Sequence, residues 1–483
     1  MTARRRYTVA RDNGGVETAA EAPAAASQCV ALPYYPDGSQ VFATLRDLTG
    51  AVFLDSSCGR GDAGRYDLIA ASPDPERSAT LGATPDTAAV ETFFARLNQV
   101  HKAAALSHRA RSNDLPFNGG LIGYLGYDAG LPLHGLTTND SAGAAQALPA
   151  AQVGYYPWSI IQDHLRGESW LVADGSIAQN ELADIVERVH SAAPPTAGFA
   201  LETEFNANML AADYAGAFAR ISQYIQAGDC YQVNLAQRFS ARYTGDPLAA
   251  YRLLRPLAAA AFSGYMDIAP GQALMCLSPE RFISLREGEV ATQPIKGTRP
   301  RSDDPARDLA IARELQDSVK DRAENLMIVD LLRNDLGRSC QPGSIQVDAL
   351  FALRSYPSVH HLVSTIRGRL QDDRTAVDLL RDSFPGGSVT GAPKRRAMQI
   401  IAELEPHPRQ AYCGSFFYLC NSGRMDSNIT IRSLVADQGK LHCWAGGGIV
   451  ADSRCAAEYQ ETFDKVGAFL QALENCRAPA THQ

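Results

Sequence analysis

The sequence has 483 residues, more than the roughly 250–300 residues that usually share one hydrophobic core, so it predicts two core regions or one large composite domain. Hydrophobic residues make up 45% and charged residues 20%, as in ordinary globular enzymes, and the net charge of −8 argues against nucleic acid or an anionic membrane as the main partner. Ten cysteines without a C-x-x-C pair or a paired Cys/His spacing indicate reduced, mostly buried thiols of a cytoplasmic protein, and they argue against a zinc site or a disulfide framework.

The N-terminal part predicts a disordered tail followed by a mixed region of strands and helices. Residues 1–28 are first basic and then rich in alanine, without the apolar run of a signal peptide. No stretch of the chain reaches the length of a membrane span. Over 29–190, the strand-like runs AVFLD, RYDLIAA, GGLIGYLGYD and SWLVAD alternate with helical patterns. The clearest helix is TPDTAAVETFFARLNQVHKA, with Thr84 or Asp86 as its N-cap, and SAAPPTAGFA at 191–200 predicts a linker.

The second region, 201–475, predicts strand-rich blocks followed by helices, which favours α+β packing. DYAGAFARISQYIQAGD is amphipathic and helical, and DCYQVNLAQRFSARY alternates like a strand. ALMCLSPERFISLREGEV and VATQPIKGT predict a hairpin, and long helices are expected over 305–336 and after TGAPK. Three strands, CGSFFYLC, SNITIRSLVA and LHCWAGGGIV, come before a last helix over 453–474.

The helix expected over 305–336 carries four carboxylates at helical spacing. Glu314, Asp317, Asp321 and Glu324 step by 3, 4 and 3, so they would share one face. A solvated acidic face explains most of them. Glu324 differs, because the apolar run that follows it places it near the buried side.

The last predicted helix carries a second group, Glu458 and Glu461, with Lys465 four residues further on. A salt bridge between Glu461 and Lys465 is one interpretation. The other is one pole of a Mg²⁺ site, since magnesium prefers oxygen ligands from one or two carboxylates, water and substrate. The spacing alone leaves both open.

Glycine-rich and polar motifs offer further candidates. FPGGSVTGAPKRRAM leads into a helix, with Pro393 in its first turn, and could present free N–H groups to an anion. Tight turns or sheet packing explain it, and the glycines of WAGGGIV, equally well. SPERF places Glu280 on a strand, either as an acid with a raised pKa or as a partner of an arginine. His360 and His361 are adjacent on a strand, so at most one can point at a given site.

The stretch QPIKGTRPR contains a lysine in an unusual setting. Lys296 lies between a β-branched residue and Gly297, which lets the backbone turn or approach a ligand. A surface lysine at a strand end is the simpler interpretation of this stretch alone.

Nine motifs occur together in a fixed order. They are GDCYQVNLAQRF, LSPERF, PIKGTRPR, DRAENLMIVDLLRNDLGR, VHHLVSTI, FPGGSVTGAPK, the IR of NITIR, AGGGIV and EYQETFDK. The set resembles the chorismate-utilising enzymes, a family that includes anthranilate synthase component I, aminodeoxychorismate synthase component I, and the isochorismate and salicylate synthases. The resemblance covers about 205–475 and extends, more weakly, to an N-terminal region at 29–190. It implies a four-layer α/β/β/α fold, with two packed, mainly antiparallel sheets, helices outside and the active site in a cleft between the sheets.

The pentapeptide PIKGT, which contains Lys296, resembles the motif of the aminodeoxychorismate synthases in this family. Anthranilate synthases resemble one another in carrying PIAGT at the same site. The resemblance therefore implies an amination of chorismate by ammonia, grouped with the transaminases, that yields 4-amino-4-deoxychorismate for p-aminobenzoate and folate synthesis. The lysine amine would add at C2 as the C4 hydroxyl leaves, and ammonia would then add at C4 and expel the lysine. Glu280 would be the general acid at the leaving hydroxyl. A lysine that only holds the ring by charge remains the competing role.

The resemblance also implies roles for the other site residues. Mg²⁺ would be bound by Glu324 and Glu461, with Glu458 acting through water. Gln232 replaces the lysine base of the water-using synthases, which favours ammonia as the nucleophile, and His361 would lie near the substrate. The residues implied for the two carboxylates of chorismate are Ser388, Thr390 and Gly391 at the ring carboxylate, and Tyr412, Arg432, Gly446, Gly447, Gly448 and Lys465 at the enolpyruvyl carboxylate.

Two departures from the family bear on regulation and partners. FLDS and FSGYM stand where tryptophan-inhibited anthranilate synthases carry LLES and NPSPYM, so feedback inhibition by tryptophan is not expected. No G-x-C-x-G motif of a glutaminase is present, so ammonia is expected from a separate glutamine amidotransferase subunit or from solution. An anthranilate synthase component I and a non-catalytic chorismate- or tryptophan-binding subunit remain the alternatives.

Overall fold

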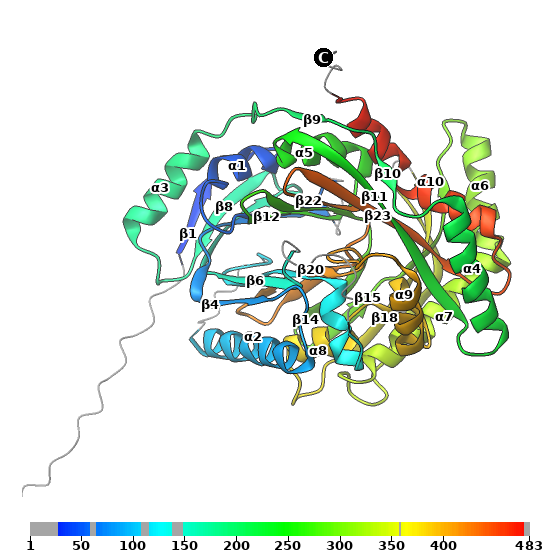
Figure 1. The fold of residues 1–483 in the computed structure, drawn as a ribbon. Coiled ribbons are helices and arrows are strands. Elements are labelled where there is room, and N and C mark those ends of the chain that lie inside the picture. The colour runs from blue at the N-terminus through cyan, green and yellow to red at the C-terminus, as the bar shows by residue number, and fades with distance from the viewer. Residues whose placement is uncertain (1–27, 58–63, 108–114, 138–147, 357–358, 478–483) are drawn as a thin grey trace, which may run out of the picture.

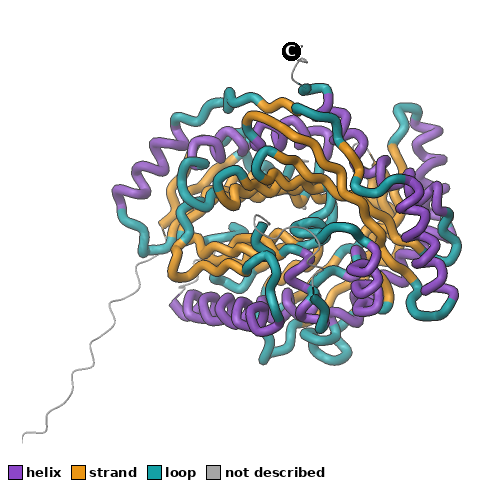
Figure 2. The backbone as a smooth tube through the Cα atoms, in the orientation of Figure 1, coloured by secondary structure: helices purple, strands orange, loops and turns teal. Residues whose placement is uncertain are grey.

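The computed structural model describes residues 28–57, 64–107, 115–137, 148–356 and 359–477, so all but the last residue of the predicted tail lies outside them. Two large sheets lie face to face across the middle of the molecule, with helices on their outer sides (Figures 1 and 2). The ladders within the sheets are antiparallel. This arrangement confirms the predicted α+β fold with four layers in the order α/β/β/α.

The first sheet combines strands from both ends of the chain. Its order is β1 (Gln28–Leu32), β8 (Glu168–Ala173), β7 (Trp158–Asp163), β3 (Tyr66–Ala70), β2 (Val52–Asp55), β12 (Phe262–Ala269), β13 (Gln272–Ser278), β22 (Ser433–Asp437), β23 (Lys440–Ile449), β11 (Gln232–Gly245) and β10 (Asn206–Ala207). Two short strands, β9 (Phe199–Leu201) and β19 (Gly391–Ala392), also pair with β11.

The second sheet also combines strands from the N-terminal and C-terminal parts of the chain. Its order is β16 (Ile295–Pro300), β18 (Val359–Arg369), β15 (Glu289–Thr292), β14 (Arg281–Arg286), β21 (Met425–Asn428), β20 (Ser415–Cys420), β5 (Gly120–Leu125), β6 (Ala151–Tyr156) and β4 (Asp74–Leu81), with β17 (Gln346–Ser355) paired to β18. Strands from before and after the segment 191–200 thus share both sheets, while the exact limits of the two regions stay a prediction.

The helices pack against the outer faces of the sheets (Figure 1). The first sheet carries α1 (Gly38–Leu45), α3 (Gln179–His190), α5 (Pro247–Ala258) and α10 (Cys455–Glu474). The second sheet carries α2 (Thr87–Ser107), α6 (Pro305–Asp317) and α7 (Val319–Leu336), and α8 (Ala376–Ser383) packs against α2 and α7. The ends of β11 and β19 contact α4 (Ala211–Gln226) and α9 (Lys394–Leu404).

Alternation along a central strand shows how the layers are held together. In β13, Leu274 and Cys276 belong to the core that lies between the sheets, whereas Ala273, Met275 and Leu277 belong to the core under the outer helices. A strand buried on both faces must be apolar at every position, because successive side chains point to opposite sides. The apolar run ALMCL within β13 therefore indicates a central strand.

The predicted helix over 305–336 is wrong in one respect, because the chain forms two helices. Ser318 has extended backbone angles and ends α6, and its hydroxyl accepts a hydrogen bond from the Asp321 N–H (3.2 Å) as the N-cap of α7. The shared acidic face is therefore lost. Glu314 and Asp321 nevertheless meet, since both form ion pairs with Arg299.

Three smaller predictions also need correction. SNITIRSLVA is two strands, β21 and β22, which lie in different sheets. Glu280 does not lie on a strand but in the two-residue connection between β13 and β14. Pro393 is the N-cap of α9 and not part of its first turn. The hairpin prediction is confirmed for β14 and β15 alone, since β13 belongs to the first sheet.

One of the two N-caps predicted for the first long helix is confirmed. The Asp86 carboxylate accepts a hydrogen bond from the Ala89 N–H (2.8 Å) at the start of α2. Six of the nine cysteines among the described residues are buried, as expected for most of them. Within the described ranges, no helix combines the length and the apolar character that crossing a membrane requires.

Candidate active site

A cavity of about 870 Å³ opens where the ends of the two sheets meet α7 and α10. Its size suits a small-molecule substrate. Residues from both sheets, from both helices and from the loop Phe384–Pro393 line it. Twelve of the predicted site residues are among them: Glu280, Lys296, Glu324, His361, Ser388, Tyr412, Arg432, Gly446, Gly448, Glu458, Glu461 and Lys465.

Glu280 and Arg432 reach the cavity because the chain crosses between the two sheets at both places. The first crossing runs from β13 to β14, and the second runs from β21 to β22. The two crossings are bonded side by side, since the Ile429 N–H donates to the Glu280 carbonyl (3.0 Å) and the Leu277 N–H donates to the Arg432 carbonyl (3.2 Å). Neither residue was expected at a crossing, because strand periodicity carries no information about which sheet a strand joins.

A β-bulge turns Lys296 toward the cavity. The pairing of β16 with β18 shifts register between Ile295 and Thr298. Gly297 adopts φ +84°, and a Cβ at this position would lie 2.9 Å from a Leu315 methyl group. Glycine is therefore required after the lysine, both for the backbone angle and for the close approach of α6 and α7. The Lys296 ammonium donates to the Ser388 carbonyl at 3.3 Å.

Glu280 has the environment of a buried acid. Its side chain is largely buried, and burial raises the pKa of this carboxyl above its ordinary value, although the Lys296 ammonium and the Ser388 hydroxyl oppose that shift. Burial favours the protonated form, because the carboxylate loses its hydration. The same cavity therefore holds a carboxyl with a raised pKa and a lysine close to it.

Three further carboxylates line the cavity. Burial raises the pKa of Glu324 on α7 and of Glu458 on α10, and neighbouring acids add to both shifts. Burial acts in the same sense on Glu461, but the Lys465 ammonium at 2.6 Å outweighs it and lowers the pKa of that carboxyl. A cation between these groups would relieve their mutual repulsion.

Glu458 shows most clearly that a cation would fit. One of its carboxylate oxygens, Oε2, is buried without a hydrogen-bond partner among the described residues. The space beside this oxygen is open because residue 447 is a glycine. A Cβ at Gly447 would lie 3.1 Å from Oε2 of Glu458 and 3.4 Å from Oε1 of Glu461. Among the residues that the structure describes, no three His, Cys, Asp or Glu side chains form a complete metal cage. A Mg²⁺ site here would need oxygens from water or substrate, as magnesium sites commonly do.

The cavity also contains a group that can bind an anion, the guanidinium of Arg432. Within the described part of the chain, the side chain of Arg432 makes no hydrogen bond or ion pair, and burial lowers its pKa. Burial, together with the Arg432 charge, also lowers the pKa of His361 to about 4, so its imidazole is neutral near pH 7. A partly buried, unpaired guanidinium is a favourable place for an anion to bind.

Comparison with known proteins identifies the family of the chain. A model of the chorismate binding enzyme family matches residues 56–471. The chain belongs to this family. It is 47% identical to aminodeoxychorismate synthase component 1 of Klebsiella aerogenes over 92% of this chain and 99% of that protein. Anthranilate synthase component 1 of Streptomyces coelicolor is more distant, at 38% identity over 78% of each chain. The crystal structure of anthranilate synthase component I from Streptococcus pneumoniae has the same fold, with a TM-score of 0.72 and 29% identity over 85% of this chain and 93% of that one.

Four of the predicted site residues do not line this cavity. Gln232 is buried behind Gly448, and its amide nitrogen has no partner among the described residues. The Thr390 hydroxyl donates to carbonyls within its own loop. Gly391 adopts φ +149°, and a Cβ there would collide with the Gln232 carbonyl. Gly447 faces the carboxylates of α10. These residues shape the walls, and their roles toward substrate stay predictions.

The sequence prediction missed several residues of the cavity wall. They include Asn234, Thr298, Lys320, Asp321, Arg409, Trp444 and Asp464. Lys320 could have been found, since it lies four residues before Glu324 and pairs with it at 3.7 Å. Arg409 could not, because only the tertiary structure shows that this arginine is buried.

Proposed function

We propose that this chain is component 1 of an aminodeoxychorismate synthase, which converts chorismate and ammonia to 4-amino-4-deoxychorismate. The observation that carries the proposal is that Lys296 and Glu280 line one cavity, close enough for the lysine charge to lower the pKa of the acid. Three relatives named aminodeoxychorismate synthase component 1 are 43–47% identical to the chain, whereas the anthranilate synthase component 1 of Streptomyces coelicolor is 38% identical.

The two residues divide the chemistry between them. Glu280, whose pKa burial raises, donates a proton to the C4 hydroxyl, which leaves as water. Lys296 is a nucleophile only after its ammonium group has lost a proton, and its nitrogen then forms a bond at C2 as the C4–O bond breaks and the ring double bond shifts. Ammonia then adds at C4, the double bond returns, and the C2–N bond to the lysine breaks. The product keeps its enolpyruvyl group and the configuration at C4.

The walls of the cavity fit the two carboxylates of chorismate. Arg432, the unpaired guanidinium, binds the enolpyruvyl carboxylate together with Tyr412, whose ring stacks on Trp444. Lys465 and the Gly446–Gly448 segment border the same space. On the other side, the Ser388–Gly391 segment faces the ring carboxylate. Two anchors at opposite ends hold the ring carbons between the lysine and the acid.

Mg²⁺ fits the side of the cavity formed by Glu324, Glu458 and Glu461. When bound, the ion would neutralise the charge of the ring carboxylate. The unpartnered Glu458 oxygen supports its inclusion in this site. These three residues orient the ion, and Lys465 keeps Glu461 ionised for it.

Ammonia comes from a partner that hydrolyses glutamine. The relatives are named as a first component, which implies a second one. Gln232 supports ammonia as the nucleophile, because an amide side chain cannot serve as a general base toward water.

Product identity tests the proposal. Purified protein is incubated with chorismate, Mg²⁺ and an ammonium salt, and the products are separated and weighed by mass spectrometry. A product that retains the enolpyruvyl group, and becomes p-aminobenzoate only after a lyase is added, supports the proposal. Fluorescent anthranilate would assign the chain to the alternative synthase. A protein that binds chorismate without converting it, with ammonium or with an added amidotransferase, would support a binding subunit. The variant Glu280→Gln serves as the inactive control.

A further inference from the structure

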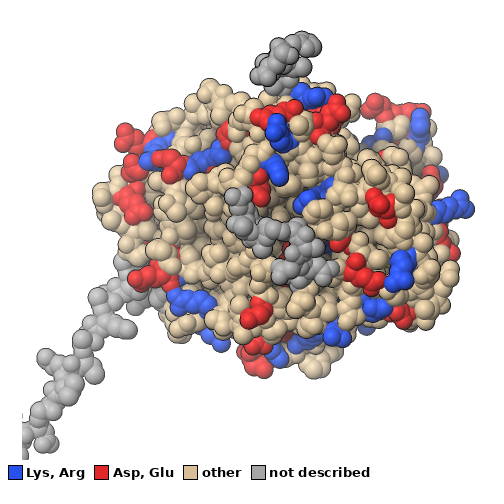
Figure 3. Space-filling view, viewed as in Figure 1, with Lys and Arg blue, Asp and Glu red and all other residues tan. Residues whose placement is uncertain are grey.

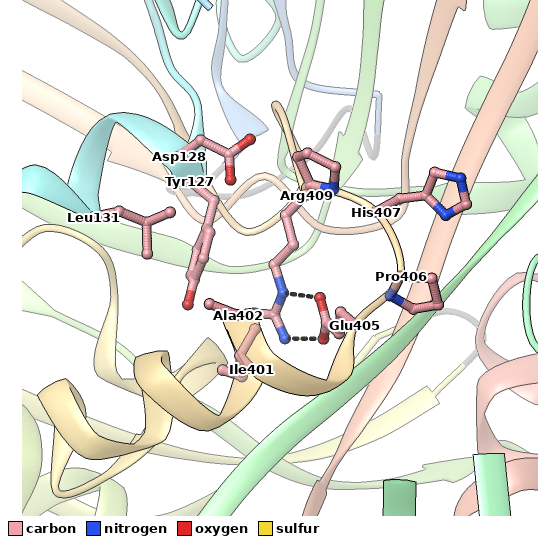
Figure 4. A pocket seen from close by; sticks show the side chains of 10 residues that line it. Tyr127, Asp128, Leu131, Ile401, Ala402, Glu405, Pro406, His407 and Arg409 are labelled. Atoms are coloured by element: carbon pink, nitrogen blue, oxygen red, sulfur yellow. Dashed lines mark hydrogen bonds and ion pairs between the residues drawn. The ribbon is translucent and has the colours of Figure 1, made fainter. Parts of the chain in front are cut away.

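A buried ion pair lies directly behind the catalytic cavity. Arg409 and Glu405 face each other through two parallel hydrogen bonds, from Nε to Oε2 (2.9 Å) and from Nη2 to Oε1 (2.6 Å) (Figure 4). Their side chains are only 2% and 5% exposed. Removing both charges from water is so unfavourable that apolar residues of similar volume often give equal or greater stability. Fold stability is therefore a weak explanation for the pair.

The remaining donors of Arg409 bind two other segments. Nη1 donates to the Val389 carbonyl (2.9 Å), and Nη2 also donates to the Asn234 carbonyl (2.8 Å). Four of the hydrogen bonds that the guanidinium can make thus go to protein acceptors, and Glu405 neutralises its charge. Arg409 lines the cavity, but unlike Arg432 it is not available to bind a substrate anion.

A short chain of contacts leads from this pair to the catalytic lysine. The side-chain amide of Asn234 donates to the Ser388 carbonyl (3.3 Å), and the Asn234 N–H donates to the Thr390 carbonyl (2.9 Å). The Ser388 carbonyl is also the acceptor for Lys296. Arg409 and Asn234 together therefore hold three successive carbonyls, of Ser388, Val389 and Thr390.

We propose that Arg409 and Glu405 are positioning residues for the amination. They fix the Ser388–Thr390 segment against β11, and that segment fixes the amine of Lys296 relative to Glu280. The inference rests on the proposed function, since it assigns a purpose to the orientation of Lys296. A planar fork is needed at this position, because only arginine can bind a carboxylate and two carbonyls in fixed directions.

The surroundings of the pair support a rigid anchor. The Arg409 guanidinium lies over the Tyr127 ring, 4.7 Å from its centre, and within 5.9 Å of the Tyr412 ring on the cavity side. Glu405 also accepts a hydrogen bond from the Ala236 N–H (2.9 Å) in β11. The cavity on the far side, which Figure 4 shows, measures only about 30 Å³. The guanidinium thus has little room to move.

The test separates catalysis from stability by three variants. Arg409→Lys keeps the charge but loses the fork, Arg409→Met leaves Glu405 unpaired, and Arg409→Met combined with Glu405→Leu replaces the pair by apolar side chains. We expect Arg409→Lys and the double variant to lower kcat at least tenfold while the Kd for chorismate changes less than threefold. We also expect the double variant to regain most of the melting temperature that Arg409→Met loses. Near-normal kcat in a folded double variant would overturn the proposal, as would a kcat loss that only follows the unfolded fraction.

A matched control is available in another ion pair with a buried carboxylate. Asp163, whose side chain is 2% exposed, pairs with Arg65 at 2.6 Å and does not line the cavity. Asp163→Asn should lower the melting temperature and leave kcat per folded molecule unchanged. If the wild-type product is anthranilate, the proposed function fails, but the same comparison of kcat with Kd can still be made on that product. The two proposals therefore fail by different results.

Discussion

The Lys296 ammonium and the Ser388 carbonyl form a hydrogen bond of 3.3 Å between residues that are 92 positions apart in the sequence. The bond joins the edge strand β16 of the second sheet to the loop that leads into β19 of the first sheet. The position of the amine is therefore set by both sheets at once. Any change in how the loop is held should alter the reactivity of the lysine more than the stability of the fold.

Removing the amine should abolish most of the reaction without abolishing binding. Lys296→Ala is expected to lower turnover roughly a hundredfold or more if the lysine is the nucleophile. Chorismate should still bind, because Arg432 and the loop Phe384–Pro393 remain. Turnover is measured by mass spectrometry of the product and binding by calorimetry. Lys320→Ala, at another lysine of the cavity wall, should have a much smaller effect, and unaltered turnover in Lys296→Ala would rule out a covalent role.

The acid role of Glu280 predicts a particular pH dependence. Burial raises the pKa of this carboxyl, so its proton is retained to higher pH than on an exposed glutamate and is lost as the pH rises through the folded-state value. We expect kcat to fall on the alkaline side of that value. Glu280→Gln should lower kcat about a hundredfold or more and remove this alkaline limb. A variant that keeps the limb would assign it to another group.

The metal carboxylates should be revealed by titration with Mg²⁺. Glu458→Gln and Glu461→Gln are each expected to raise the Mg²⁺ concentration for half-maximal activity about tenfold or more. Direct Mg²⁺ binding in the presence of chorismate, measured by calorimetry, should weaken in parallel. Glu474→Gln at the end of the same helix is the control and should leave the titration unchanged. Unchanged binding in Glu461→Gln would exclude that residue as a ligand.

Gly447 allows a test that changes no charge. In Gly447→Ala, the new methyl carbon would lie 3.1 Å from Oε2 of Glu458 and must displace one of the carboxylates. We expect weaker Mg²⁺ binding and lower activity in a folded protein. Gly467→Ala is the matched control on α10, because a Cβ there meets nothing within 4 Å. Equal Mg²⁺ binding in the two variants would show that the carboxylates have room to move.

Asp128 predicts a pH dependence of stability that is separate from catalysis. It is buried beside Arg409 and Glu405, and burial raises its pKa to about 7. Since the folded-state pKa lies above the unfolded value, its contribution is fully present below about pH 4 and is lost as the pH rises through about 7. Over this window the free energy of unfolding should fall by up to about 1.4 kcal/mol for each pH unit from this group.

The variant Asp128→Asn should remove that slope, because its amide oxygen can still accept the hydrogen bond from the Gln410 N–H. Above pH 7 the variant should be the more stable protein, as measured by denaturant unfolding at several pH values. Asp452→Asn, on an exposed turn, is the control and should keep the wild-type slope. Identical slopes for Asp128→Asn and the wild type would contradict the expectation.

The sequence by itself determined the local structure and the chemical inventory of the site. Period-two patterns placed β11 and β23, the helical pattern placed α2, and ordered motifs singled out Lys296, Glu280 and the carboxylates of α10. These features are encoded within a few residues, since side-chain period, capping and backbone freedom are local properties.

Only the tertiary structure decided how those residues meet. The break at Ser318, the crossing of the chain between sheets at Glu280 and Arg432, and the burial of Arg409 each depend on segments that are far apart in the sequence. Spacing along the chain cannot show which sheet a strand joins or which carbonyl an arginine reaches. Those outcomes follow from the packing of the two sheets against each other. This packing brings residues of separate motifs together around one cavity.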